Sequence, residues 1–447
     1  MQAFLFLESK IMFSRKDIIV LGMMIFALFL GAGNIIFPPM EGFSSGQHWT
    51  SASLGFVLTG VLMPFITLVV VAILGRGEEL TKDLPKWAGT GFLVILYLTI
   101  GSTFAMPRIT NVAYEMAWLP LGLTENNANV RFVFSLIFNL IAMGFMISPN
   151  TIISSVGKFM TPALLVLLIA VAITVFISPL SEIQAPSNAY ENSHSLLIGL
   201  TSGYQTMDVL AAIAFGGIVA RALSAKNVTK TKDIVKYTIS AGFVSVILLA
   251  SLYFSLFYLG ATSAAVAEGA TNGGQIFSRY VNVLFGSAGT WIMAGIIVLA
   301  SLTTLVGVTS ASADYFAKFS SRFSYPFWIA LFTAMTITVS QYGLTDLLRI
   351  TIPALLLIYP VAIVLVLLQF LRKKLPSIKF TYNSTLLVTV CFSLCDSLNN
   401  VKMLPESINS LLKHFPLSSE GMAWLVPTLV MLVASIFIGK ALHKTHS

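Results

Sequence analysis

The sequence contains few charged residues. Asp, Glu, Lys and Arg make up 10% of its 447 residues, whereas hydrophobic residues make up 56%. Because an average soluble domain carries roughly 25% charged residues, this composition excludes an ordinary soluble protein. The mean hydropathy of +0.87 points the same way. The chain is predicted to be an integral membrane protein.

Cysteine and histidine are also scarce, which argues against metal centres and disulfide frameworks. Cys391 and Cys395 share one apolar stretch and are interpreted as packing residues. The five histidines have no metal-ligand spacing and lie in loops or the tail, at positions 48, 194, 414, 443 and 446. The phosphate-binding pattern GxxxxGK[ST] is absent, so ATP is not the expected energy source. No paired carboxylates, histidine cluster or nucleophile motif lies within the apolar stretches, and we expect no enzyme.

Long apolar stretches dominate what is present. About twelve of them reach the roughly twenty residues needed to cross a ~30 Å hydrocarbon layer as a helix. They are rich in Leu, Ile, Val and Phe without alternation, which is typical of helices rather than of barrel strands. The predicted fold class is an all-α polytopic membrane protein. The stretches cover residues 17–40, 52–75, 87–118, 131–148, 157–177, 196–222, 234–260, 286–316, 325–341, 344–371, 383–400 and 421–441.

The net charge of +8 follows the loops between these stretches. One alternating set of loops, with both termini, holds most basic residues: Lys10, Arg15, Lys16, Arg76, Lys82, Lys86, Lys158, Arg221, Lys226, Lys230, Lys232, Lys236, Lys318, Arg322, Arg372, Lys373, Lys374, Lys379, Lys440 and Lys444. The other set holds only Arg131, Arg279, Lys402 and Lys413. The positive-inside rule then predicts cytoplasmic termini and an even number of spans, with the first span retained rather than cleaved. Nucleic acid is not an expected partner, although residues 221–236 are also a candidate lipid-headgroup patch.

Two of the stretches contain helix-breaking residues near their middle. The first is "GAGNIIFPPMEG", residues 31–42, which begins about 20 Å into the first span at 1.5 Å per residue. The second is "TSGYQTMDVL", residues 201–210, in the sixth span. Unwound backbone is tolerated at this depth only when it is buried in protein or lines a wet cavity. The alternative is that the glycines permit close packing and the prolines only kink the helix.

The spacing of these breaks predicts an inverted repeat of five plus five helices. Spans one and six are five apart and therefore run in opposite directions. Spans three and eight are also five apart, and they contain "GSTFAMPR" (101–108) and "ASLTTLVGVTSASAD" (300–314). The predicted division is a cytoplasmic segment 1–16, repeats 17–178 and 196–371, two additional helices within 381–441, and a cytoplasmic tail 442–447.

The opened backbone indicates the kind of ligand. Amides at 31–34, at the start of a half-helix, favour an anion such as a carboxylate. Carbonyls near Gly203 would suit an ammonium group, and an α-amino acid carries both. Carbonyls at the end of the inner half-helix and the hydroxyls of Thr303 and Thr304 would form an oxygen nest for Na⁺. The alternative for the threonines is a bond back to their own helix.

Ionisable residues within spans are costly and each is a site hypothesis. Asp208 is interpreted first as a helix cap, with cation binding and proton transfer as alternatives. Arg108 is expected to snorkel or to form a buried ion pair rather than to contact substrate. Asp346 and Arg349 are expected to form a solvated pair, and Asp314 to be interfacial.

Four blocks of the sequence resemble the bacterial branched-chain amino acid:cation symporters, in that family's order. They are "ALFLGAGNIIFPPMEG", "GSTFAMPRITNVAYE", "GYQTMDVLAAIAFGG" and "SLTTLVGVTSASADYFA". The resemblance covers nearly the whole chain. It implies a leucine-transporter-like fold, a bacterial inner-membrane location and Na⁺-coupled uptake of leucine, isoleucine and valine.

A more distant likeness of the Gly-Asn in "GAGNIIFPP" to sodium-coupled amino acid symporters implies site residues. Carbonyls of Ala27 and Leu30 would face the cation together with Ala300, Thr303 and Thr304. Amides of Phe29, Ala32 and Gly33 would face the carboxylate, and Asn34 would bind a second cation or close the break. The apolar part of the substrate pocket is predicted from Phe29, Phe104, Met106, Tyr204 and Met207.

Two competing functions share much of this pattern. A proton-coupled amino acid transporter of the same fold would use Asp208 as the titrating group. A channel would lack saturable counterflow. Apart from the small-molecule substrate and the lipid bilayer, no obligate partner is indicated.

Overall fold

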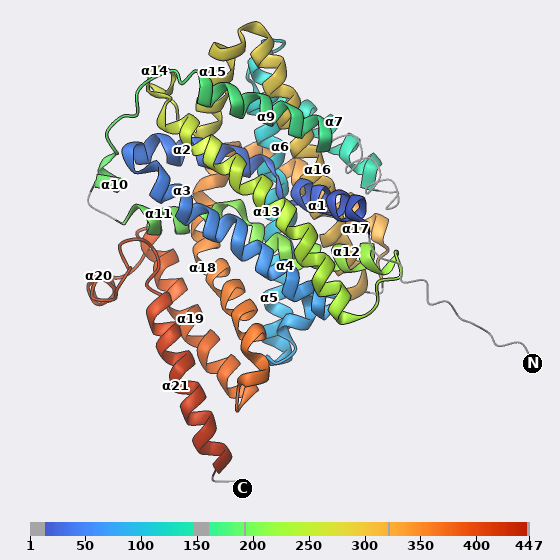
Figure 1. Ribbon diagram of the computed structural model, residues 1–447, viewed down its shortest axis with the longest axis vertical. Coiled ribbons are helices and arrows are strands. Elements are labelled where there is room, and N and C mark those ends of the chain that lie inside the picture. Colours follow the sequence, from blue (N-terminus) through green and yellow to red (C-terminus); the bar gives the residue numbers. More distant parts are fainter. Residues whose placement is uncertain (1–13, 147–160, 192–193, 321, 445–447) are drawn as a thin grey trace, which may run out of the picture.

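The computed structural model describes residues 14–146, 161–191, 194–320 and 322–444. Within these ranges every regular element is a helix (Figure 1). The predicted N-terminal segment 1–16 and tail 442–447 lie partly outside the described residues. Lys10, Lys158 and the facing ends of the predicted spans 131–148 and 157–177 lie outside the described residues.

Helices coincide with all twelve predicted stretches wherever those stretches are described. The helices are α1 (Arg15–Phe29), α2 (Ala32–Ser45), α3 (Trp49–Val57), α4 (Met63–Leu74), α5 (Lys86–Leu98), α6 (Ala105–Val112), α7 (Ala128–Met146), α9 (Thr161–Ile177), α10 (Asn188–Glu191), α11 (Ser195–Ser202), α12 (Asp208–Ser224), α13 (Thr231–Ala261), α14 (Ala264–Ala267), α15 (Gly273–Phe285), α16 (Ser287–Phe319), α17 (Tyr325–Val339), α18 (Leu344–Leu371), α19 (Ile378–Asn400), α20 (Glu406–Leu412) and α21 (Leu425–Lys444).

Length and composition identify fewer spans than the sequence pattern predicts. Among the described residues, seven helices are long and apolar enough to cross a membrane, or eight if the bent pair formed by α11 and α12 counts as one span. Two shorter apolar helices, Pro162–Ile177 and Leu425–Ala441, add to these. The run Gly33–Leu74 counts as one helix of 42 residues, although the chain turns within it at Gly46, where φ is +48°. A polytopic helical membrane protein is confirmed, and the count of twelve stays a prediction.

Both predicted interruptions are present. The helix α1 ends at Phe29, and Gly31 has extended backbone (φ −92°, ψ 169°) before α2 begins. Pro38 and Pro39 lie inside α2 and do not mark the break. In the sixth span a short 3₁₀ turn follows α11, and Met207 takes a left-handed conformation (φ 62°) before α12. The axis bends there by 47°.

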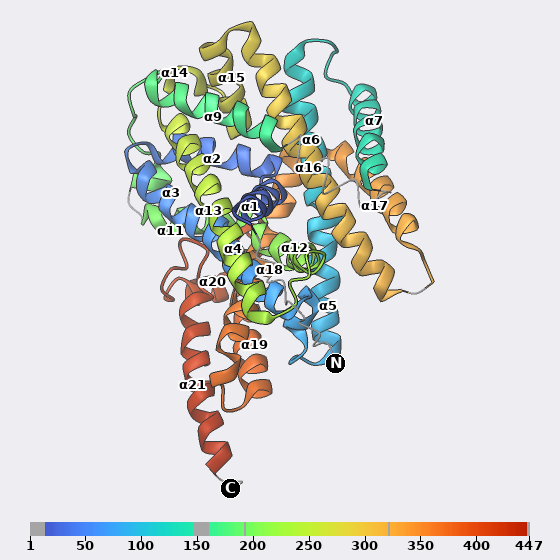
Figure 2. The same ribbon diagram turned by 45° about the vertical axis from the view of Figure 1, so that its right-hand side comes forward.

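The two broken spans run antiparallel. The first half of span one, α1, packs against the second half of span six, α12, while α2 packs against α11 (Figures 1 and 2). Because the first half of each span packs against the second half of the other, the two spans run in opposite directions through the bundle. The interruptions therefore meet in the middle of the bundle, as the five-span spacing predicts.

Spans three and eight lie side by side but differ in regularity. Span three is interrupted between α5 and α6, where Gly101 has non-helical backbone (φ −87°, ψ −136°). Span eight is the unbroken 33-residue helix α16. It packs along α5 and α6, and Figure 2 shows it crossing the molecule beside α6. The sequence composition identified this pair as unusual without showing that only span three is broken.

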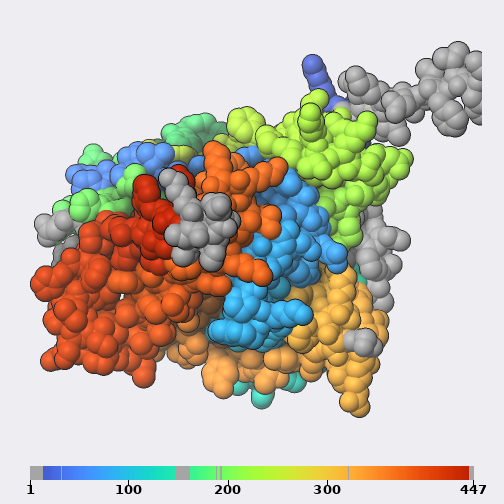
Figure 3. Space-filling model, turned by 90° about the horizontal axis from the view of Figure 1, so that it is seen from below, coloured from blue at the N-terminus to red at the C-terminus, as the bar shows by residue number. Residues whose placement is uncertain are grey.

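Basic loops gather on one face of the molecule. Seen from below, the α12–α13 turn, the segment before α5 and the α16–α17 turn share that face (Figure 3). Ion pairs join these loops to neighbouring helix ends: Arg221 lies 3.6 Å from Asp314, Lys226 lies 3.4 Å from Asp17, and Arg372 Nε donates to Asp83 over 2.7 Å.

Peripheral elements account for the remaining sequence features. The two additional helices stack outward, α19 on α18 and α21 on α19 (Figure 1). Cys391 and Cys395 on α19 are free thiols, and Cys391 is exposed rather than packed in the core. Asp346 and Arg349 form the expected solvated pair at 3.6 Å.

The backbones of α3 and α11 approach so closely that a single methyl group should separate them. A Cβ on Gly199 would lie 2.0 Å from the Ala52 carbonyl oxygen, whereas one on Gly144 of α7 would meet nothing within 4 Å. We therefore expect Gly199→Ala to lower the free energy of unfolding by about 1–3 kcal/mol and Gly144→Ala to leave it unchanged or raise it by up to about 1 kcal/mol. Thermal unfolding of both purified variants in detergent would measure this. Equal melting temperatures would contradict the close packing.

Candidate functional site

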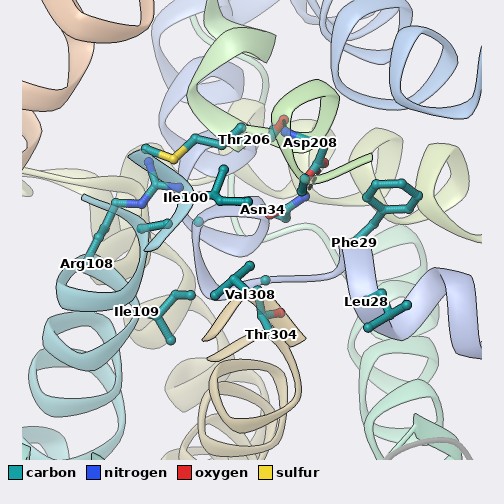
Figure 4. A pocket seen from close by; sticks show the side chains of 15 residues that line it. Leu28, Phe29, Asn34, Ile100, Arg108, Ile109, Thr206, Asp208, Thr304 and Val308 are labelled. Carbon is teal, nitrogen blue, oxygen red and sulfur yellow. Dashed lines mark hydrogen bonds between the residues drawn. The ribbon is translucent and has the colours of Figure 1, made fainter. Parts of the chain in front are cut away.

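A small enclosed cavity lies where the two interruptions meet α6 and α16 (Figure 4). Its volume is about 30 Å³. This is room for about one or two water molecules and less than a leucine side chain requires. The lining consists of Leu28, Phe29, Gly31, Gly33, Asn34, Ile100, Ala105, Arg108, Ile109, Thr206, Met207, Asp208, Ala211, Thr304 and Val308.

The first interruption exposes backbone groups to this cavity. The Thr304 hydroxyl, on α16, donates to the Leu30 carbonyl oxygen over 3.1 Å. The Gly31 amide turns back to the Phe29 carbonyl over 2.7 Å. At the start of α2 the first amides have no acceptor within their own helix. The break thus presents acceptors on one side and donors on the other.

Neutral oxygen atoms surround the end of α1. Thr303 and Thr304 are buried, as are Ala27 and Ala300. The Thr303 hydroxyl donates to the Ala300 carbonyl over 2.9 Å, as the alternative interpretation of the threonines requires, whereas Thr304 reaches across to the other helix. No cluster of three or more His, Cys, Asp or Glu side chains occurs in the described part of the chain. Neutral oxygen atoms are ligands of hard cations rather than of transition metals.

The second interruption is tied to the first through side chains. Asn34 Nδ2 donates to Asp208 Oδ2 over 2.7 Å, and it also contacts the hydroxyl of Tyr253 on α13. The Tyr253 hydroxyl lies 3.5 Å from the same carboxylate oxygen. Asp208 stands in the first turn of α12 but makes no capping bond to it. The cap interpretation is therefore wrong, because Asn34 and Tyr253 supply the partners of this carboxylate instead.

Arg108 reaches the same cavity from α6. Its side chain is 3% exposed, so it does not snorkel to the interface. Nη1 donates to the Gln205 carbonyl over 2.9 Å, and the guanidinium lies over the Phe37 ring at 5.4 Å. Among the described residues no carboxylate lies within 4 Å of it, which removes the expected ion pair.

The structure brings only part of the predicted substrate set to the cavity. Phe29, Gly33, Asn34 and Met207 line it, and the backbone of Ala32 begins α2 beside it. Four other candidates do not line it: Phe104, Met106, Gly203 and Tyr204.

Packing explains two of these placements. Tyr204 stacks on Tyr359 with ring centroids 4.5 Å apart, and it lines a wider cavity of about 480 Å³ between α11, α18 and residues 419–421. Gly203 packs against Thr59, whose Oγ1 would lie 2.1 Å from a Cβ at that position. In the present conformation neither residue reaches the central cavity.

Sequence reasoning missed most of the apolar lining. Leu28, Ile100, Ile109, Ala211 and Val308 resemble any other residue of a membrane span, so no local signal identifies them. Arg108 did carry a signal, because an ionisable residue within a span is costly unless it is used.

Comparison with known proteins places the chain in a family. The family described as "Branched-chain amino acid transport protein" matches residues 14–442. The branched-chain amino acid permease BrnQ of Haemophilus influenzae is 99% identical over 98% of this chain and 100% of that protein. BrnQ of Escherichia coli is 34% identical over 95% of this chain and 96% of that protein. The branched-chain amino acid permease BraB of Bacillus subtilis is 33% identical over 95% of this chain and 96% of that protein.

Solved structures share the fold at low sequence identity. A nucleobase-cation-symport-1 family transporter in a closed conformation matches with a TM-score of 0.62 and 12% identity, over 96% of this chain and 93% of that one. A Na⁺-coupled sialic acid symporter matches with a TM-score of 0.61 and 10% identity, over 94% of this chain and 89% of that one. The predicted leucine-transporter-like fold is confirmed. Since both the family match and the 99% identical relative span nearly the whole length, the chain belongs to the branched-chain amino acid transport protein family.

Proposed function

We propose that this protein imports leucine, isoleucine and valine by Na⁺-coupled symport across a bacterial inner membrane. The observation that carries the proposal is the meeting of two antiparallel broken helices at one buried cavity. Interrupted helices of this kind hold substrate and coupling ion in secondary transporters. The names of the relatives support the substrate, since they are branched-chain amino acid permeases.

The cation is proposed to bind at the end of α1. The Leu30 carbonyl and the Thr304 hydroxyl are already within 3.1 Å of each other, and Ala27, Ala300 and Thr303 complete the proposed set. All of these ligands are neutral oxygens, which suits Na⁺. One charge moved across about 100 mV supplies about 2.3 kcal/mol toward accumulation of substrate.

The amino acid is proposed to bind across the first interruption. Its carboxylate would face the amides of Phe29, Ala32 and Gly33, and its branched side chain would contact the apolar lining of the cavity. Because the cavity of about 30 Å³ is too small for leucine, the surrounding helices have to separate to admit it. Alternating access by movement of the broken helices supplies such an opening.

The proposed orientation places both termini in the cytoplasm. The loops that carry most of the basic residues share one face (Figure 3). Positively charged loops remain on the cytoplasmic side during insertion. The ion pairs of Arg221, Lys226 and Arg372 described above would then close the cytoplasmic side.

A second candidate function is proton-coupled transport of the same substrates. It is favoured by one observation, the buried Asp208 carboxylate on the cavity wall. Uptake of radiolabelled leucine into vesicles containing the purified protein separates the two. An inward Na⁺ gradient at fixed pH should drive accumulation, and a pH gradient without Na⁺ should not. Accumulation driven only by the pH gradient would refute Na⁺ coupling, and absence of leucine counterflow would refute a carrier.

The Thr304 hydroxyl should matter more for the ion than for the fold. We expect Thr304→Ala to raise the half-saturating Na⁺ concentration at least about tenfold, since it removes a ligand worth about 1.4 kcal/mol or more. Thr304→Ser keeps the oxygen and should stay close to the unchanged protein. Na⁺ titration of leucine uptake measures both. Equal Na⁺ dependence in the two variants would contradict the assignment.

A side chain at Gly33 should displace the Arg108 guanidinium and obstruct the first interruption. A Cβ there would lie 2.8 Å from Arg108 Nη2 and would cover the amides at the start of α2. We therefore expect Gly33→Val to abolish leucine binding. Gly91→Val is the matched control, because a Cβ at Gly91 meets nothing within 4 Å. Equilibrium binding of labelled leucine to both purified variants is the measurement, and full binding by Gly33→Val would show that the break only kinks the helix.

A further inference from the structure

We propose that the Arg108 guanidinium binds the substrate carboxylate and makes a free carboxylate a requirement for binding. This inference rests on the proposed amino acid transport and deepens it, because it assigns a role to a side chain that the backbone-based site leaves out. Arg108 lies on α6, in span three, and therefore belongs to neither span one nor span six.

The first argument is the unsatisfied charge of Arg108. A guanidinium offers five N–H donors and does not lose its proton. Here one donor bonds to the Gln205 carbonyl, while Nε is buried without a hydrogen-bond partner. A buried cation without an anion is costly, and no carboxylate in the described ranges lies within 4 Å. Asp208 lies on the same cavity wall but bonds to Asn34 and forms no direct pair with Arg108, so the guanidinium has no anion in contact with it among the described residues.

The second argument is where the guanidinium points. Arg108 extends from α6 toward the first interruption, on the opposite side of Asn34 from Asp208 (Figure 4). Its Nη2 would lie only 2.8 Å from a Cβ at Gly33, so it lies directly against the start of α2. An anion here would meet the guanidinium and the positive end of the α2 dipole together. A planar carboxylate matches the paired donors of arginine.

The third argument is the balance of charge around the cavity. Among the described residues that line it, Arg108 and Asp208 are the only ionisable ones. They come from α6 and α12 and are separated by Asn34, which holds the Asp208 carboxylate over 2.7 Å. An amino acid carries one charge of each sign. A cavity whose one permanent charge is the Arg108 guanidinium is matched to the carboxylate of such a zwitterion and mismatched to a molecule that has lost its carboxylate.

A competing role is that of a structural latch. The bond from Arg108 to the Gln205 carbonyl joins span three to the second interruption, and its loss alone would weaken every ligand equally. Loss of a contact with the carboxylate would instead weaken the binding of only those ligands that carry a carboxylate. Leucine and leucinamide differ in this one group, and at about pH 6.5 both keep a protonated amino group.

The experiment measures leucine and leucinamide binding by calorimetry on the purified full chain, in Na⁺ at about pH 6.5. The unchanged protein should bind leucine at least about 30-fold more tightly than leucinamide, the fold-change expected when a buried charge pair loses one partner. Arg108→Gln should lose at least about 30-fold in leucine affinity and keep its leucinamide affinity within about threefold. The leucine affinity of Arg108→Lys should lie between those of the unchanged protein and Arg108→Gln, because lysine keeps the charge and lacks the planar pair of donors.

Arg131→Gln is the matched control. Arg131 also bonds one carbonyl, that of Gln341 at 3.1 Å, and lies over the Tyr114 ring, but it does not line the cavity. It should leave the ratio of the two affinities unchanged. Equal loss of leucine and leucinamide in Arg108→Gln would establish the latch and overturn the proposal.

Equal affinities in the unchanged protein would overturn the proposal without any variant. If Arg108→Gln does not elute as a folded species, the unchanged protein and Arg108→Lys decide the question. Failure of the proposed function would look different: the protein would still bind leucine more tightly than leucinamide, and Na⁺-driven uptake would be missing.

Discussion

A peptide group inside a membrane needs a hydrogen-bond partner from the protein, and this constraint organises the centre of the molecule. Breaking a helix at Leu30 and Gly31 uncovers groups that lipid cannot satisfy. The Thr304 hydroxyl donates a hydrogen bond to the Leu30 carbonyl. Asn34, in the first turn beyond the break, donates to Asp208 and Tyr253. The break is therefore tolerated only where three other helices converge on it.

The same contacts join elements that are far apart in sequence. Asn34 belongs to span one, Asp208 to span six and Tyr253 to span seven, and their polar atoms meet in a buried group. Arg108 adds span three through the Gln205 carbonyl. Each partner reaches across from another span, so the conformation of the two breaks is coupled. A change at one of them alters the hydrogen bonds available to the other.

The sequence predicted the architecture well because helix breaks and apolar length are local properties. The Gly31 and Met207 regions were identifiable from glycine, asparagine and polar residues within otherwise apolar runs. The orientation of single side chains is not a local property. Tyr204 and Phe104 are plausible pocket residues by type, yet tertiary packing places Tyr204 against Tyr359. Arg108 and Asp208 were recognised as unusual, but their partners lie on other spans and could not be read from spacing.

The close approach of α3 and α11 has a mechanical meaning. Reciprocal contacts of Gly55 with the Leu196 carbonyl and of Gly199 with the Ala52 carbonyl leave no space in which the two backbones can slide past each other. The first half of span six, α11, is thereby held against α3 of span two. Any tilt of α11 that widens the centre has to carry α3 with it as one rigid arm, so the bending has to occur at the Gly203–Met207 joint and at the π-helical turn Leu58–Leu62 that ends α3.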